Sequence, residues 1–528
     1  MMNTLLDRAI LTTGALLALV LGGYAQTEKP ATAGKPNILL ILVDDMGYSD
    51  LGCYGGEIKT PHIDSLATNG LRYSQFYNSA RCVPTRASIL SGYYAQQINR
   101  DSVSDIKRTK DGIRPAWAPL LPKYLKRAGY RSYHSGKWHI DGKPIGSGFD
   151  RSLYIDSNNF FNPGKLFKDD KPHPPKEGFY ATTAVADHTI EVLKEHQTHH
   201  ADQPFFSFVA FTAPHFPLQA LPEDIERVGD RYQVGWDVIR HQRWERLQEM
   251  GLIRGTLSEV EYDQGPPFDF SDQLTVLGND EVTLPTPWKD LTDTQKEFQQ
   301  TKMKIHAAMV ERVDTEVGRI IEQLKAMHCF EDTVIFFLSD NGASAEMMVR
   351  GSGHDPKAAA GSADTFLCLG PGWSTVANTP FRKHKIWAHE GGTCTPMIVH
   401  GPNHTSQPGE IRETSGHVID FVPTVLDLAG ITLKKKKVPF PGKSLLPTFK
   451  QDRDMTRTLW WSHRDNHAIR SGDWKLVKSN DGEWELFQIN QDRAETKNLA
   501  AQHPVKCKEL KKLWEDQVNQ FREDRKIK

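Results

Sequence analysis

The apolar run Ile38-Leu39-Leu40-Ile41-Leu42-Val43, which ends directly in Asp44-Asp45, is the stretch that decides the fold class. Its residues do not alternate between apolar and polar, so a strand formed from them is buried on both faces. Similar runs recur later, and segments with apolar residues at helical spacing lie between them. Strands that alternate with helices predict an α/β protein built on a large, doubly wound mixed sheet. The further strand segments are 205–211, 334–338 and 397–399, and the clearest helical ones are 120–128 and 301–327.

Polar side chains follow these predicted strands at the point where each strand ends. Two acids follow the first strand, an Asp-Asn pair follows 334–338, and a histidine follows 205–211. A weaker strand at 131–134 leads into a Gly-Lys-Trp-His segment. Because ligands of open α/β sheets bind beyond the carboxyl ends of the strands, these side chains are expected to form one site. The residues concerned are Asp44, Asp45, Lys137, His139, His215, Asp340 and Asn341.

Four members of this set, Asp44, Asp45, Asp340 and Asn341, offer oxygen atoms as ligands. Oxygen ligands suit a hard cation such as Ca²⁺ or Mg²⁺ better than Zn²⁺, which favours histidine and cysteine. Either pair alone is also a common turn sequence at the end of a strand. Two such pairs, after the two strongest buried strands, favour a metal site.

The sharpest local motif is Arg81-Cys82-Val83-Pro84-Thr85-Arg86, which continues to Ser91-Gly92. Pro84 fits the first turn of a helix, so Cys82 is expected near a helix N-terminus. Free backbone N–H groups and the helix dipole favour anions there, and the forked guanidinium of Arg86 suits sulfate or phosphate oxygens. The sequence predicts an anion-binding site with a reactive group, Cys82, at its entrance. A buried structural cysteine beside a surface arginine is the competing interpretation.

Taken together, these motifs resemble the type I formylglycine-dependent sulfatases, a family of the alkaline phosphatase-like superfamily. The signature of that family matches Cys82-Val-Pro84-Thr-Arg86, with Gly92 closing the motif. The resemblance runs from about Pro36 to the C-terminus, and the order of its motifs is more specific than any one of them. The other matching segments are 37–47, 136–139, 213–215, 338–342, 379–392, 484–492 and 498–500.

The resemblance implies a reaction for Cys82. A formylglycine-generating or sulfatase-maturing enzyme would oxidise Cys82 to formylglycine, whose hydrated gem-diol attacks sulfur and forms a covalent sulfate ester. Loss of sulfate then regenerates the aldehyde, a step that an unmodified thiol cannot perform. One Ca²⁺ ion would lower the pKa of the diol and balance the charge of the sulfate. The resemblance places this ion on Asp44, Asp45, Asp340, Asn341 and the modified Cys82.

The resemblance also assigns the remaining catalytic positions. Arg86 and Lys137 would hold the anionic diol, and His139 would act as the base when the intermediate breaks down. His215 and Lys385 would contact the sulfate and leaving-group oxygens, where one of them protonates the departing alcohol. Lys385 is preferred over the adjoining Lys383 and His384 because it precedes Glu390 by five residues, as in the family. His389 replaces the family tryptophan and is expected to face the pocket.

Composition and the first residues predict an exported protein. With 65 Lys+Arg against 66 Asp+Glu, the chain lacks the basic excess of a nucleic-acid-binding protein. Arg8, an apolar run from Ile10 to Leu21 and Gly23-Tyr24-Ala25 predict a signal peptide at 1–25, with an uncleaved anchor as the alternative. No later segment is apolar enough to cross a membrane, so the mature protein is expected to be periplasmic or secreted. Six cysteines are too few for a disulfide-built scaffold.

The predicted domains are a catalytic domain at 36–430 and a smaller C-terminal α+β subdomain at 431–528. Short antiparallel strands near 458–487 and a helix near 505–522 are expected in the subdomain. The lysine run 434–437 is interpreted as a solvated linker in preference to a polyanion-binding segment. The polar segment 221–302 is expected to insert beside the active-site edge, where loops carry specificity.

The predicted function is removal of sulfate from a sulfated glycan or oligosaccharide. Sulfated carbohydrate is favoured as the substrate over a steroid or simple aryl sulfate because exported relatives most often resemble enzymes of polysaccharide breakdown. Two alternatives stay open: a phosphate or phosphonate ester hydrolase of the same superfamily, and a non-catalytic protein that binds sulfated glycans.

Overall fold

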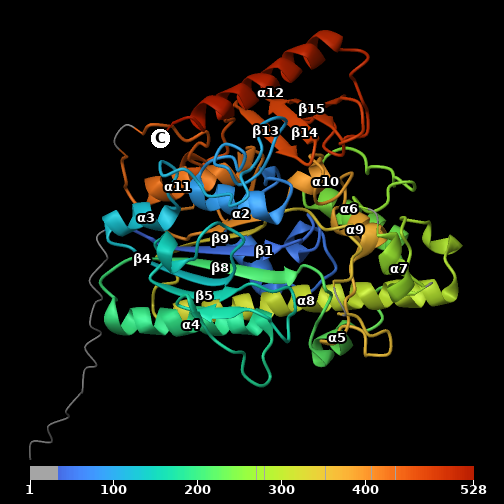
Figure 1. Cartoon of the computed structure of the whole chain (residues 1–528), viewed down its shortest axis with the longest axis horizontal. Coiled ribbons are helices and arrows are strands. Elements are labelled where there is room, and N and C mark those ends of the chain that lie inside the picture. Colours follow the sequence, from blue (N-terminus) through green and yellow to red (C-terminus); the bar gives the residue numbers. More distant parts are fainter. Residues whose placement is uncertain are drawn as a thin grey trace, which may run out of the picture.

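The structure is a computed structural model that describes residues 34–527 except 269, 279, 351, 352, 406, 434 and 435. The predicted signal peptide, 1–25, lies outside the described residues. Figure 1 shows a central sheet covered by helices on both faces, with a second sheet and the C-terminal helix above it.

The central sheet has ten strands: β1 (Asn37–Asp44), β2 (Leu71–Tyr73), β4 (Arg131–Lys137), β5 (Arg151–Ile155), β6 (Leu166–Lys168), β7 (Lys171–Pro172), β8 (Phe205–Pro214), β9 (Thr333–Ser339), β10 (Met397–His400) and β11 (Ile411–Arg412). They lie in the order β11-β2-β10-β9-β1-β8-β4-β5-β6-β7. The five strands from β9 to β5 are parallel, whereas β10, β6 and β7 pair antiparallel with their inner neighbours. The predicted doubly wound mixed sheet is confirmed.

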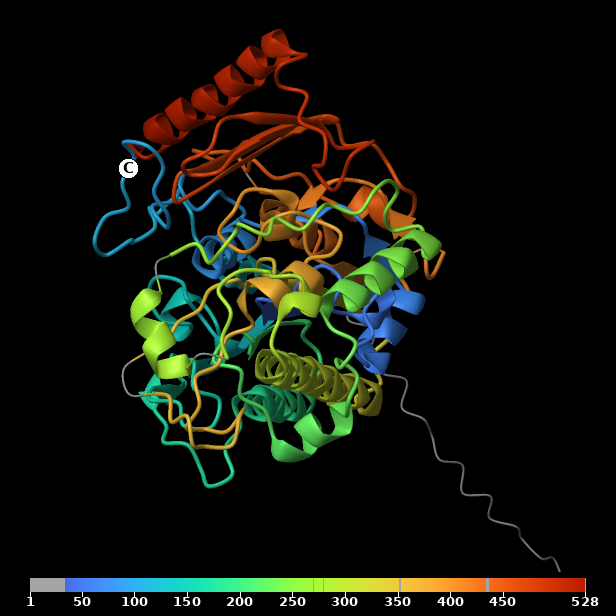
Figure 2. The same cartoon turned by 90° about the vertical axis from the view of Figure 1, so that its right-hand side faces the viewer.

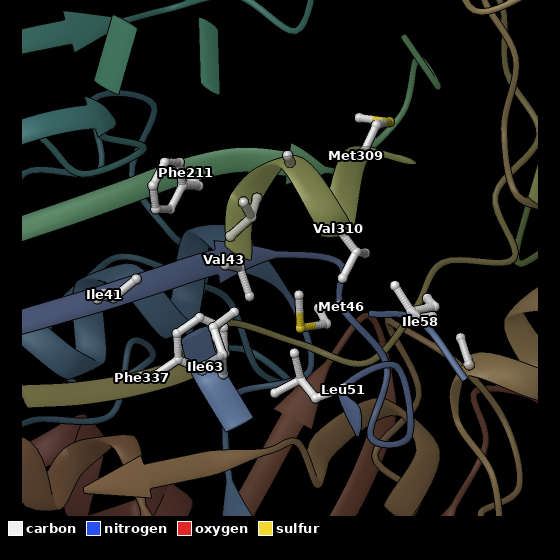
Figure 3. Close-up of a cluster of buried hydrophobic side chains, with 14 of the residues drawn as sticks. Ile41, Val43, Met46, Leu51, Ile58, Ile63, Phe211, Met309, Val310 and Phe337 are labelled. Carbon is white, nitrogen blue, oxygen red and sulfur yellow. The ribbon is translucent and has the colours of Figure 1, made fainter. Parts of the chain in front are cut away.

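Both faces of β1 are buried, as its unbroken apolar sequence predicts. Leu39, Ile41 and Val43 enter one core, against the long helices α4 (Ala181–His199) and α8 (Asp293–Ala326). Figure 3 shows Ile41 and Val43 in this core with Phe211, Val310 and Phe337. The alternate residues of β1 enter a second core, against α2 (Cys82–Ser91), α3 (Leu121–Leu125) and α11 (Phe421–Leu428). A strand between two helical layers has no solvent-facing side, so it needs no polar residue.

The C-terminal part forms a separate small sheet, as expected. The strands β13 (Thr458–His463), β14 (Asn466–Ser471), β15 (Trp474–Lys478) and β16 (Glu485–Gln488) are antiparallel in sequence order. Helix α12 (Pro504–Asp524) lies across this sheet, as Figure 2 shows. Trp460 and Leu476 of the sheet pack with Leu510 and Trp514 of the helix.

The polar segment 221–302 contains α5 (Pro222–Val228), α6 (Trp236–Glu249) and α7 (Ser271–Leu277), which periodicity alone did not predict.

The lysine run 434–437 also differs from the expectation. Lys434 and Lys435 lie outside the described residues, but Lys436 is half-buried, and its Nζ lies 3.6 Å from the centre of the Phe440 ring. It also donates to the Tyr124 hydroxyl at 2.6 Å. The solvated-linker prediction is therefore wrong for Lys436, because nearby aromatic rings cover its side chain.

Candidate active site

The site lies at the edge of the sheet where β1, β8, β9 and β4 end. Asp44 is the last residue of β1, and Asp340 follows the last residue of β9 directly. His215 follows β8, and Lys137 closes β4. Since these four strands are parallel neighbours, their carboxyl ends meet at one edge. The structure therefore brings the predicted strand-end residues together.

Cys82 is the first residue of helix α2, where the motif predicts it. Arg81, the N-cap residue, is extended with φ −157°, and the helix ends at Gly92, whose φ of 78° is left-handed. The Gly92 N–H donates to Ser88 O at 2.8 Å, so the glycine closes the helix. Burial raises the pKa of the Cys82 thiol, and Asp44 raises it further, although Lys137 opposes the shift. The thiol is therefore uncharged and a weak nucleophile at neutral pH.

Arg86 lies one turn along α2 and is completely buried among acids. Its Nε donates to Asp340 Oδ2 at 2.8 Å, and its Nη2 lies 3.5 Å from Asp44 Oδ2. Lys137 Nζ forms an ion pair with the same Asp44 oxygen. Burial alone would raise the pKa of Asp44, but Lys137, His215 and Arg86 hold it well below its usual range. Arg86 is therefore a buried anchor of the acidic cluster, and the interpretation of a surface arginine is wrong.

Asp45 joins a second group of side chains. Asn341 Nδ2 donates to its Oδ1 at 2.6 Å, and Lys385 Nζ donates to its Oδ2 at 2.9 Å. His215 Nε2 lies 3.6 Å from the same Oδ2. The φ of Asp45 is 65°, a left-handed conformation that is rare outside glycine and often marks a functional position. The two adjacent acids thus point their carboxylates at different cations.

Several oxygen atoms of this cluster suit a cation. Asp44 Oδ1 and Asn341 Oδ1 are buried and accept no hydrogen bond from any residue that the structure describes. Asp44, Asp45 and His215 each place a possible ligand atom within 4.8 Å of the others. The oxygens of Asp340 instead face Arg86 Nε and, at 3.4 Å, the Asp45 N–H. Buried oxygen atoms without hydrogen-bond donors are the ligands that a hard cation prefers, so these residues are chemically suited to Ca²⁺ or Mg²⁺.

The unmatched charge of the cluster also appears in its pKa values. Burial raises the pKa of Asp340 to about 7, with a further contribution from Asp44 that Arg86 opposes. Burial raises the pKa of Asp45 to about 6, against the attraction of Lys385. Three acids in one dry site cannot all ionise easily without an additional positive charge.

The two histidines of the site are neutral. Burial, together with Lys137, holds the pKa of both His139 and His215 well below the usual value. A neutral imidazole can accept a proton, as a base must. His139 Nδ1 is buried without a hydrogen-bond partner among the described residues, and its φ of 55° is left-handed.

The structure distinguishes Lys385 from its neighbours. Lys385 Nζ lies 2.9 Å from Asp45 Oδ1 and 3.1 Å from Glu346 Oε2. Burial opposes a charge on Lys385, but Asp45 and Glu346 raise its pKa above the usual value. Lys383 instead pairs with Glu261, from the inserted segment, at 2.9 Å, and His384 bonds to Ser374. The five-residue spacing to Glu390 thus selects the lysine that reaches the cluster.

Glu346 is a residue that the sequence did not predict. It is buried, and it faces Lys385 and, at 3.9 Å, Arg81. It follows the Asp-Asn-Gly turn within a loop of small residues, so no periodicity or motif marks it.

The expectation for His389 is wrong. That side chain is completely buried, and its Nε2 lies 3.0 Å from Glu485 of the small sheet, so it does not face the pocket.

A cavity of about 560 Å³ opens beside the start of α2. Arg81, Val83 and Pro84, which flank Cys82, form part of its wall, and His139 forms another part.

The family model named Sulfatase matches residues 36–431 of this chain, which include every residue of the cluster. The chain belongs to the sulfatase family. This sulfatase is a sulfuric ester hydrolase. A second model, the C-terminal region of N-sulphoglucosamine sulphohydrolase, matches residues 381–524.

Similar proteins carry sulfatase names. The sulfatase is 31% identical to an uncharacterised sulfatase of Schizosaccharomyces pombe, over 92% of this chain and 94% of that one. It is 30% identical to an arylsulfatase of Klebsiella aerogenes, over 82% and 95%. An N-acetylglucosamine-6-O-sulfatase of Bacteroides thetaiotaomicron is 25% identical, over 96% and 90%.

Solved structures share the fold. The crystal structure of Ps i-CgsB in complex with k-i-k-neocarrahexaose matches with a TM-score of 0.65 and 22% identity, covering 91% of this chain and 92% of that one. At this identity the likeness establishes the fold alone.

Among the described residues of the sulfatase, no helix has the length and apolar character needed to cross a membrane.

Proposed function

We propose that this sulfatase removes sulfate from a sulfated carbohydrate, and that Cys82, after conversion to formylglycine, supplies the nucleophile. The observation that carries the proposal is the position of Cys82 at the N-terminus of α2, above a buried cluster of Arg86, Lys137 and carboxylates. The helix N-terminus and these cations favour an anion at residue 82. Formylglycine supplies a hydrated aldehyde, whose second hydroxyl lets sulfate leave the residue.

Each neighbouring side chain then has a role in charge or proton transfer. Lys137 and Arg86, both buried and both paired with Asp44, hold the oxygens of residue 82 in an anionic form. His139, kept neutral by burial, accepts the proton that must leave before sulfate is expelled. His215 and Lys385, which meet at Asp45, are the candidates to protonate the leaving alcohol oxygen.

Asp44, Asp45, Asp340 and Asn341 would hold Ca²⁺, together with an oxygen of the modified residue 82. The unmatched oxygens of Asp44 and Asn341 support this assignment. When bound, the cation supplies the positive charge that three neighbouring carboxylates and a sulfate group require.

The choice of a carbohydrate rests on the names of relatives and on the cavity. One relative is named an N-acetylglucosamine-6-O-sulfatase, and a structural neighbour was solved with a neocarrahexaose. The cavity beside Cys82, about 560 Å³ and rich in charged residues, has room and polarity for sugar rings. The sequence also supports export after removal of 1–25 and maturation by a formylglycine-generating enzyme.

The experiment pairs peptide mass spectrometry across Cys82 with a sulfate-release assay. Protein is prepared with and without a formylglycine-generating enzyme and offered sulfated monosaccharides, sulfated oligosaccharides and 4-nitrophenyl sulfate. Turnover of a sulfated sugar should rise in proportion to the converted fraction. Equal turnover by protein whose Cys82 is still a thiol would contradict the mechanism. Activity confined to the aryl sulfate would contradict the carbohydrate assignment.

A further inference from the structure

The cavity beside Cys82 is built partly by the C-terminal sheet. One wall comes from residues around Cys82 and from His139-Ile140. A second comes from the loop 100–108. The third is the turn His463-Arg464-Asp465, which joins β13 to β14 and reaches the cavity from the small sheet above α2 (Figure 1). Residues far apart in the sequence thus meet in one concave surface.

This surface carries an excess of positive charge. Among the described residues, its lining has five Arg or Lys against two Asp. Three of these cations, Lys107, Arg108 and Arg464, are exposed and form no ion pair with any described residue. Asp101, one of the two acids, already accepts a hydrogen bond from Gln96 and lies 2.8 Å from His463 Nδ1. The positive charge of the cavity is therefore not neutralised by its own walls.

His463 adds a buried polar atom to the same surface. Its side chain is only 8% exposed, and its Nδ1 is held by Asp101. Nε2 has no hydrogen-bond partner among the described residues. Buried polar groups in native proteins nearly always have a partner, and because His463 lines the cavity, a ligand bound there would supply one. Since Nδ1 faces the Asp101 carboxylate, Nε2 donates to an anionic ligand only when the ring carries both protons.

The turn holds Arg464 in a defined place. His463 pairs with Asn466 across the hairpin, so Arg464 and Asp465 form a two-residue turn. Their φ values of 47° and 62° are both left-handed, as in the tight turns that match the twist of paired strands. The guanidinium of Arg464 lies 4.4 Å from the centre of the Phe268 ring, which limits its motion. Arg464 is thus partly ordered before any ligand arrives.

We propose that this cavity binds a second anionic group of the substrate, a sulfate or carboxylate on the sugar, and that Arg464 is the specificity-determining residue. The inference rests on the proposed function, because it assumes that the scissile sulfate lies at residue 82. The cations assigned to residue 82 and its sulfate, Arg86, Lys137 and Lys385, are already paired with carboxylates. The unpaired cations of the cavity are separate from them. A forked guanidinium suits sulfate and carboxylate oxygens alike.

The kinetic test compares three probes that share one scissile group. They are D-glucosamine 6-O-sulfate, D-glucosamine 2-N,6-O-disulfate, and an unsaturated uronate disaccharide of the 6-O-sulfate. For converted wild-type enzyme, kcat/KM should be about tenfold higher with the second sulfate or with the carboxylate, the size of one charge-assisted hydrogen bond. The probe that gains more identifies which anion the cavity binds.

Arg464→Asn tests the residue, because asparagine tolerates the left-handed turn but carries no charge. The preference for a second anion should fall about tenfold, and Arg464→Lys, which keeps the charge but loses the fork, should keep only part of it. Arg227→Gln, which removes the same charge from exposed helix α5 on the other side of the central sheet, should keep all of it. Two results would overturn the inference: no preference in the wild type, or an unchanged preference in Arg464→Asn, as when all three probes lose equally.

A binding measurement separates this inference from the proposed function. The Cys82→Ala chain, with and without Arg464→Asn, is titrated calorimetrically with the mono- and disulfated glucosamines. Tighter binding of the disulfated probe that Arg464→Asn removes would support the subsite even if the wild type hydrolysed neither sugar, in which case the proposed function fails alone. Equal affinity for the two probes would overturn the subsite and leave the proposed function standing.

Discussion

Among the buried charges that the structure describes, two clusters are organised differently. The site cluster surrounds Asp44 and Asp45 at the edge of the central sheet. The interface cluster consists of Glu390, Arg493, Glu495, Lys475 and Tyr77. It joins helix α10 (Glu390–Thr393) to strand β15 of the small sheet. Both clusters are almost inaccessible to solvent.

The interface cluster is internally matched. Lys475 Nζ lies 2.9 Å from Glu390 Oε1 and 2.9 Å from Glu495 Oε1. Glu390 Oε2 accepts from the Tyr77 hydroxyl at 3.0 Å and lies 3.3 Å from Arg493 Nη2. Glu495 Oε2 accepts from the Glu390 N–H at 2.9 Å. Although burial opposes both charges, the pKa of Glu390 is lowered and that of Lys475 is raised, so the pair stays ionised.

The site cluster, by contrast, keeps unmatched oxygens on Asp44 and Asn341, and burial raises the pKa of Asp340 to about 7. A matched cluster gains nothing from a ligand, whereas an unmatched one is stabilised when a ligand brings the missing charge. The comparison also shows that Glu390 belongs to the interface cluster and not to the site cluster. The family motif that identified Lys385 contains this glutamate, but its contacts are with the other members of the interface cluster.

The largest expected effect is in the site cluster. Cys82→Ala should reduce sulfate release by about 10⁴-fold or more, as loss of a nucleophile does in other hydrolases. The melting temperature should change little, because only one sulfur atom is removed. Sulfate release and thermal unfolding of the same preparation check both statements. An active Cys82→Ala enzyme would contradict the assignment of catalysis to the site cluster.

The second effect is on stability, in the interface cluster. Lys475→Met would leave Glu390 and Glu495 buried without their shared cation, and should cost about 3–5 kcal/mol of unfolding free energy. Sulfate release at low temperature should stay within about threefold of wild type, since Lys475 contacts no residue of the site cluster. Denaturant unfolding and kinetics are the measurements. A loss of activity without a loss of stability would show that the interface cluster acts on catalysis.

The third effect is on the cation. Treatment with a chelator should lower the activity of converted enzyme by about a hundredfold, because the carboxylates and the sulfate would repel one another. Added Ca²⁺ should restore it and raise the melting temperature. Lys475→Met should show the same response to Ca²⁺, since its defect lies elsewhere. Full activity after elemental analysis shows no metal would contradict the assignment.

The smallest effect concerns Asp314, a buried carboxylate in neither cluster. It accepts from the backbone N–H groups of Ile63 and His62, and burial raises its pKa to about 7. The folded state then holds a proton that the unfolded state releases near pH 4. The contribution of Asp314 to stability is therefore lost as pH rises from about 4 to about 7. In Asp314→Asn, the stability difference between pH 5 and pH 8 should shrink by about 1–3 kcal/mol. Denaturant unfolding at the two pH values measures this, and an unchanged difference would show that Asp314 ionises normally.

Much of the fold could be predicted because its signals are local. The unbroken apolar run of β1 requires two covered faces, and Asp44 and Asp45 follow it in the chain. Parallel strands end at one edge, so the strand-end residues had to approach one another. Cys82 could be placed at the start of α2 because Pro84 fits the first turn of a helix. The resemblance to sulfatases rested on the same local motifs.

The tertiary structure decided which side chains face one another. Glu346 reaches Lys385 from a loop without a motif, and His389 turns toward Glu485 and away from the cavity. Lys436 lies over the rings of Tyr93 and Tyr124, which are distant in the sequence, and Arg464 reaches the cavity from another sheet. Burial on a strand or helix follows from spacing along the chain, whereas the partner of a charged side chain depends on how separate elements pack. That packing is set by the whole core, so no local pattern in this sequence could reveal it.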